Sequence, residues 1–234
     1  MNYVLSDIHG NQQRFASIMG QINLQPEDTL YVLGDVIDRH PGGIRILRRL
    51  MAMPNAKLVL GNHEYMMLRA IGRPKDSNVD DGNARAHWYR NGGKVTLDHF
   101  NRLRKNLRAE IADYLLSLPL AYNVQVNGVT YKLVHAAPAE YFDRKPQDPK
   151  YLNPIHYAVW KRWDISEPSP GDYTLIFGHT PTKYYRDVTP MEVWFDDRRI
   201  GIDCGCAYPS PEGRLACLRL EDGKVFYSQE DAAQ

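Results

Sequence analysis

The sequence predicts an α/β fold with two β-sheets, and three features of the chain lead to this prediction. The N-terminal third repeats a unit of apolar strand, polar turn and amphipathic helix. A polar stretch of helical period follows at residues 73–119, and short apolar strands dominate after Pro119. Repeated strand–helix units of about 30 residues place their strands in parallel. The strand-rich second half predicts a second sheet packed on the first.

The three early units differ mainly in their turns. Their strands are predicted at residues 3–5, 29–33 and 57–60. Each following helix carries apolar residues three or four positions apart, such as Phe15 and Ile18 in the first unit. Pro41 favours the start of the second helix, because its fixed φ suits the first turn. Since parallel strands end on one edge of a sheet, we expect the three turns to gather there.

Residues 73–119 are predicted to form a helical cover. Phe100, Leu103 and Leu107 recur at helical spacing, with basic residues on the other face. This basic face is expected to be solvated and gives no strong nucleic-acid signal. The later strands are predicted at residues 121–126, 129–134, 174–177, 193–195, 200–202, 215–220 and 225–227. Asn127-Gly128 predicts the turn of a hairpin between the first two of them.

The bulk properties indicate one globular domain over residues 1–234, with a disordered tail at 229–234. The chain has 234 residues, which suits one large core. The net charge of +1 gives no long-range attraction to nucleic acid or to an acidic membrane. Three cysteines do not make a disulfide framework, and Cys204 and Cys206 are expected to pack in a strand. Without a signal peptide or an apolar run of about 18 residues, a cytoplasmic location with no membrane contact is expected.

Five junctions between a strand and the following loop carry residues that bind metals. These residues are Asp7 and His9, Asp35 and Asp38, Asn62 and His63, His135, and His179. Carboxylate, imidazole and amide oxygen together suit divalent Mn, Fe or Zn. One such junction alone would be weak evidence, but a packing explanation for all five is very improbable.

The order of these junctions resembles the PPP branch of the calcineurin-like metallophosphoesterases, which includes lambda phosphatase and the diadenosine tetraphosphate hydrolases. The resemblance extends from Ser6 to about Arg214. It implies a four-layer α/β/β/α sandwich with two mixed sheets and a dinuclear metal site.

The resemblance also assigns metal ligands. Asp7 and His9 would hold the first ion, Asp35 would bridge both ions, and the second would take Asn62, His135 and His179. Manganese is the expected metal, with iron or zinc as alternatives. A water between two such cations loses a proton near neutral pH, and the resulting hydroxide is the expected nucleophile.

Other residues are assigned to the leaving group and the phosphate by the same resemblance. His63 would protonate the leaving oxygen, and Asp38 would orient the His63 imidazole and keep that ring protonated. Arg39 and Arg162 would bind the phosphate. Asn62 is predicted to contact the phosphate as well as the metal.

The sequence departs from the family patterns at two informative positions. Leu60 stands where phosphoprotein phosphatases usually have Arg, a position expected to face the phosphate, and in this it resembles the dinucleotide polyphosphate hydrolases. Glu64 and residues 88–96 instead resemble bacterial protein phosphatases. Pro181 replaces the second His of Gly-His-x-His, which argues against the nuclease and phosphodiesterase branch.

We therefore predict a metal-dependent phosphoesterase that hydrolyses phosphomonoesters on protein Ser/Thr, with Tyr as a further substrate. The alternative is a hydrolase of dinucleoside polyphosphates, such as diadenosine tetraphosphate, or of RNA caps. Its partner would be a phosphorylated protein or a small nucleotide. A third hypothesis, a catalytically silent phosphopeptide-binding module, is disfavoured because every ligand and the Asp38–His63 pair are present.

Overall fold

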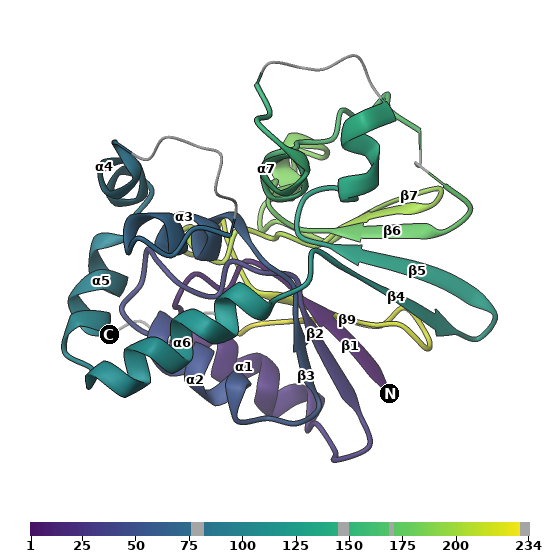
Figure 1. Ribbon diagram of the computed structural model, residues 1–234. Coiled ribbons are helices and arrows are strands. Elements are labelled where there is room, and N and C mark those ends of the chain that lie inside the picture. The colour runs from purple at the N-terminus through teal and green to yellow at the C-terminus, as the bar shows by residue number, and fades with distance from the viewer. Residues whose placement is uncertain (76–81, 145–149, 169–170, 230–234) are drawn as a thin grey trace.

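The computed structural model describes residues 1–75, 82–143, 150–168 and 171–229, together with the backbone of residue 144. Its ten strands form two mixed five-stranded sheets, as predicted, and its helices lie mainly outside them (Figure 1). Residues 230–234 of the predicted tail lie outside the described residues. Among the described helices, none combines the length and apolar character needed to cross a bilayer.

The first sheet has the strand order β10-β9-β1-β2-β3. Strands β1 (Asn2–Leu5), β2 (Thr29–Val32) and β3 (Ala56–Leu58) are parallel, as the repeated units predicted. From the far end of the chain, β9 (Ala216–Arg219) pairs antiparallel with β1, and β10 (Val225–Tyr227) pairs antiparallel with β9. The C-terminal strands thus cover the β1 edge of an otherwise N-terminal sheet.

The second sheet has the order β4-β5-β6-β8-β7. Its members are the hairpin β4 (Ala121–Val126) and β5 (Val129–Val134), then β6 (Thr174–Phe177), β8 (Arg199–Gly201) and β7 (Trp194–Asp196). Strands β5, β6 and β8 are parallel, so β5 and β6 both point their C-terminal ends toward one edge. All ten predicted strands are present, with boundaries shifted by at most two residues.

Helices cover the outer face of each sheet. On the first sheet these are α1 (Gln12–Ile22), α2 (Gly43–Met51), α3 (Asn62–Ala70), α5 (Lys94–Asn101) and α6 (Lys105–Ser117), with the short α4 (Ala84–Arg90) beside α3. The second sheet carries α7 (Pro154–Trp160) and the 3-10 helix η1 (Ala139–Arg144). A second 3-10 turn, η2 (Thr182–Tyr184), follows β6.

Alternation along the strands creates the layers. In β1, Tyr3 and Leu5 belong to the core beneath the helices, whereas Val4 belongs to the core between the two sheets. Successive side chains of a strand point to opposite faces, so an apolar strand can serve two cores at once. Leu133 and Ile176 of the second sheet meet Val4 in that central core. The predicted order of layers, α/β/β/α, is confirmed.

Candidate metal centre

The six predicted metal ligands come together at the strand ends, although their sequence positions span most of the chain. These residues come from five strand ends: those of β1, β2 and β3 in the first sheet, and those of β5 and β6 in the second. All six side chains are buried: Asp7, His9, Asp35, Asn62, His135 and His179. Five of them line a cavity of about 100 Å³, and His135 lies directly behind it against Asn62.

One group of donors surrounds His9. Its Nδ1–H donates to the Ile37 carbonyl at 3.4 Å, which leaves Nε2 as a bare lone pair. This Nε2 lies 3.8 Å from Asp7 Oδ1 and 3.8 Å from Asp35 Oδ2. Burial lowers the pKa of His9 well below its usual value, so the ring is neutral. Three potential ligand atoms therefore face one another.

A second group of donors surrounds Asn62. His135 Nδ1–H donates to the Leu33 carbonyl at 2.6 Å, so its Nε2 is a lone pair, and this Nε2 lies 2.8 Å from Asn62 Oδ1. His179 Nδ1 is 2.9 Å from the same oxygen. Asp35 Oδ1 lies 3.6 Å from His135 Nε2. Asp35 thus turns one oxygen to each group.

This donor set fits two divalent cations. Neutral imidazoles and an amide oxygen already have the protonation state that metal ligands need, whereas Asp7 and Asp35 must be ionised. Burial and the neighbouring Asp35 raise the pKa of Asp7 to about 6, and burial raises that of Asp35 to about 7. Cations would offset the cost of these buried negative charges. Two bound ions would polarise phosphate oxygens and lower the pKa of a coordinated water.

His63 and Asp38 form a buried pair beside these groups. His63 Nδ1–H donates to Asp38 Oδ2 at 2.6 Å, and its Nε2 lies 3.8 Å from Asp35 Oδ2. The same Asp38 oxygen accepts the indole N–H of Trp88 at 2.6 Å. Burial raises the pKa of Asp38 to about 7 and lowers that of His63 to about 4, although Asp35 acts to raise the latter. A charged His63 therefore depends on nearby negative charge, and Asp38 alone does not secure it.

Two arginines line the cavity. Arg39 Nη2 lies 3.5 Å from His63 Nε2, and the Arg162 guanidinium lies 5.8 Å from the ring centroid of Tyr184. The cavity therefore has positive side chains at its mouth and potential metal ligands at its base. That arrangement suits a phosphate group, whose oxygens accept from guanidinium N–H groups.

Several of these residues have left-handed backbone conformations. Six of the nine described non-glycine residues with positive φ are candidate site residues: Asp7, His9, Asp35, Asp38, Arg39 and His179. Such conformations cost about 1–3 kcal/mol each and persist where the surrounding structure imposes them. Here the left-handed residues turn the backbone sharply after each strand, so that their side chains point into the cavity.

The sequence analysis missed residues that shape the site. Glu64 accepts the backbone N–H groups of Asp35 and Val36, each at 2.9 Å, and so holds the second loop. Asp203 is buried and lines the cavity, and Asn91 and Trp160 line it too. Glu64 and Trp88 stood in segments noted for their resemblance, but only their contacts reveal what they do.

The prediction for Leu60 was wrong. Its side chain is fully buried in the core beneath the helices and is absent from the described lining of the cavity. Strand β3 ends at Leu58, and the chain turns so that Asn62, not Leu60, faces the site. Pro181 does line the cavity, at the place where the other branch of the family has its second histidine.

A mixed α/β architecture with clustered carboxylates and imidazoles at its strand ends is typical of metal-dependent hydrolases. The chain belongs to the calcineurin-like phosphoesterase family, whose model matches residues 3–206. It is 25% identical to a symmetrical bis(5'-nucleosyl)-tetraphosphatase of Erwinia tasmaniensis, over 96% of this chain and 95% of the relative. A relative of the same name from Proteus mirabilis is 23% identical, over 96% of both chains.

Solved structures share the fold. The crystal structure of a proposed diadenosine tetraphosphatase matches with a TM-score of 0.64 at 18% identity, over 99% of this chain and 94% of the other. A cold-active protein-tyrosine phosphatase of a Shewanella species matches with a TM-score of 0.58 at 17% identity, over 97% and 80%. At these identities the two matches establish the architecture only.

Proposed function

We propose that this metallophosphoesterase hydrolyses dinucleoside tetraphosphates symmetrically, releasing two nucleoside diphosphates. The observation that carries the proposal is the full-length match to relatives named for that activity. The relatives support the alternative that the sequence analysis kept open, and not its main prediction of a protein Ser/Thr phosphatase.

Each site residue has a role in this reaction. Asp7, His9 and Asp35 would hold one divalent ion, and Asp35, Asn62, His135 and His179 the other, as the two groups of donors suggest. Manganese is the first choice for reconstitution, since the ligand types suit it. Arg39 and Arg162 bind the phosphate chain, and Asn62 contacts the same phosphate.

His63 acts on the leaving side. Water adds to the second phosphorus of the chain and releases a proton to solvent, and the bond from that phosphorus to the central bridging oxygen breaks. His63, in its doubly protonated form, gives the Nε2 proton to that oxygen. Asp38 holds the ring through Nδ1, and Trp88 holds Asp38. Asp38 and Trp88 are therefore positioning residues, since neither is argued to touch the reacting atoms.

A substrate panel tests the proposal. Protein incubated with Mn²⁺ is given diadenosine tetraphosphate, phosphoserine, phosphothreonine and phosphotyrosine peptides, and a capped RNA, and the products are separated by chromatography. We expect ADP as the only nucleotide product from diadenosine tetraphosphate, with kcat/KM at least 100-fold above that for any peptide. AMP with ATP as products, or a preference for a phosphopeptide, would refute it.

A further inference from the structure

A second cavity, of about 400 Å³, adjoins the metal centre. Helices α3, α4 and α7 supply its walls, and α3 packs against each of the other two (Figure 1). Trp160 lines both cavities, and its ring packs edge-on against His179, with centroids 5.7 Å apart at 87°. Trp160 is therefore a wall that the two cavities share.

The walls combine flat rings with positive charge. His87 of α4 is stacked on Trp160 of α7, with centroids 5.7 Å apart and planes 17° apart. Arg69 and Arg90 also line the cavity, and none of its described lining residues is a carboxylate. Aromatic faces stack on nucleobases, and guanidinium groups bind phosphate oxygens. The cavity thus carries the features that recognise the two ends of a nucleotide.

The volumes of the two cavities indicate which part of the substrate each could hold. The metal cavity, at about 100 Å³, has room for a phosphate group but not for a nucleoside. The adjoining cavity, at about 400 Å³, falls within the usual range of about 300–1,000 Å³ for small-molecule sites. Met66 and Leu152 add apolar surface to it, which favours a base and ribose over a free phosphate.

We propose that this cavity binds the nucleoside of one nucleoside diphosphate half, with its base against the His87–Trp160 pair. Arg90 then contacts the phosphates that lead from the metal centre, while Arg69, which donates to the Tyr65 hydroxyl at 2.8 Å, forms the cationic wall. This proposal rests on the proposed function, because it assigns a place to one half of that substrate.

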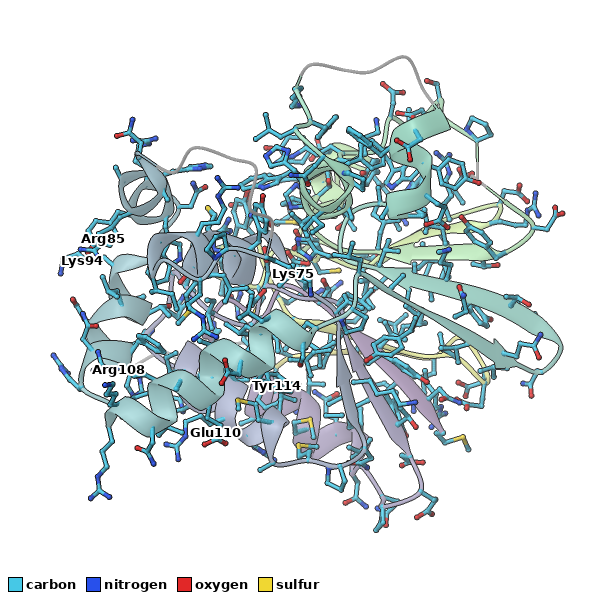
Figure 2. All side chains as sticks on the ribbon, in the orientation of Figure 1. Lys75, Arg85, Lys94, Arg108, Glu110 and Tyr114 are labelled. Carbon is cyan, nitrogen blue, oxygen red and sulfur yellow. The ribbon has the colours of Figure 1, made fainter. Side chains whose placement is uncertain are left out.

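Equilibrium binding of ADP and of inorganic pyrophosphate to Mn²⁺-loaded protein tests the assignment. His87→Ala should raise the dissociation constant of ADP at least tenfold and that of pyrophosphate less than twofold, because only ADP carries a base. Arg90→Gln should raise the dissociation constant of ADP at least fivefold. The matched control is Arg85→Gln, since Arg85 lies on the same helix but among the basic side chains at the outer edge of the molecule (Figure 2). Arg85→Gln should change the dissociation constants of ADP and pyrophosphate by no more than twofold.

The outcomes separate this proposal from the proposed function. Unchanged ADP binding in both His87→Ala and Arg90→Gln overturns the nucleoside site, even if the wild-type protein cleaves diadenosine tetraphosphate to ADP. An equal loss of pyrophosphate binding in His87→Ala also overturns it. If the predicted losses occur but diadenosine tetraphosphate is not cleaved, the cavity is a nucleotide site and the proposed function fails. Circular dichroism confirms that each variant is folded.

Discussion

At the scale of single residues, the candidate centre depends on buried side chains that each contact more than one neighbour, with Arg39 and Arg162 lining the same cavity. Asp35 illustrates this, because its two oxygens face different groups of donors and its backbone N–H is held by Glu64. Its side chain also accepts the backbone N–H of His63 at 3.0 Å. One carboxylate therefore connects both proposed ion sites, the proposed acid and the loop that carries them.

Asp35→Asn should abolish turnover, with kcat reduced at least ~10³-fold, because a neutral amide cannot balance the charge of two cations. Metal content, measured by mass spectrometry after dialysis, should fall from two ions per chain. Asp98→Asn is the control, since Asp98 is exposed on α5 and forms an ion pair with Lys94. Full activity of Asp35→Asn, or of the wild-type protein after exhaustive chelation, would contradict a dinuclear mechanism.

His63→Asn should lower kcat by ~10²–10⁴ on a substrate with a basic leaving group, because only protonation of the leaving oxygen is lost. Phenyl phosphate and p-nitrophenyl phosphate make the comparison, since p-nitrophenolate hardly needs a proton. Two ions per chain should remain bound. An equal loss on both substrates would argue against His63 as the acid.

Leu60→Arg should destabilise the protein by roughly 3 kcal/mol or more, because it places a charged group in a packed apolar core. Urea unfolding measures the change. The control is Ile165→Arg, at a side chain that is 56% exposed, which should shift stability by about 0.5 kcal/mol or less. A stable Leu60→Arg protein with altered substrate preference would show that residue 60 reaches the site after all.

At the scale of elements, the site lies where the loops of the first sheet meet the loops of the second. The loops after β1, β2 and β3 supply Asp7, Asp35 and Asn62, and those after β5 and β6 supply His135 and His179. Gly178, which follows β6, packs against the loop that follows β1. A methyl group there would collide with Ser6 Oγ and Asp7 Oδ2.

Gly178→Ala should therefore separate the loops, lowering kcat at least ~10-fold and stability by about 1–3 kcal/mol, in line with other overpacking substitutions. Gly20→Ala is the matched control, because a methyl group at Gly20 meets no atom within 4 Å and the residue lies inside α1. Alanine is the better helix former, so Gly20→Ala should raise the melting temperature. Wild-type activity in Gly178→Ala would show that the two loops can accommodate the added methyl group.

At the scale of the whole molecule, the core beneath the helices of the first sheet and the core between the sheets share strands, and this predicts joint unfolding. The first sheet lies between them, since Leu5 belongs to one core and Val4 to the other. The three free cysteines report on both: Cys206 and Cys217 in the core beneath the helices, and Cys204 between the sheets. Burial raises the pKa of all three thiols above the usual range, which suppresses their reactivity.

A thiol reagent should consequently label none of the cysteines in the native protein and three in urea. All three should become reactive at the same urea concentration, which circular dichroism should also give as the unfolding midpoint. Labelling of Cys204 at a lower concentration than Cys217 would indicate that the second sheet unfolds separately. Such a result would count against the prediction of a single domain.

The sequence by itself determined the ten strands, their alternation and the residue types at the strand ends. These are local properties: a strand that alternates between two apolar faces is recognisable without its neighbours, and a turn residue follows from backbone sterics. The candidate ligands Asp7, His9, Asp35, Asn62, His135 and His179 could be selected for the same reason, because each directly follows a strand or opens the next helix. Their assignment to ions stays a prediction.

Only the tertiary structure decided what depends on distance between remote segments. Leu60 is two positions from Asn62 yet lies in the core, since the turn after β3 sets which side chain faces the site. Trp88 reaches Asp38 across 50 positions, and Glu64 reaches the loop at Asp35 across 29. The left-handed conformations at Asp38 and Arg39 are likewise imposed by packing. Side-chain type limits which contacts are chemically possible, and the arrangement of the sheets selects the ones that form.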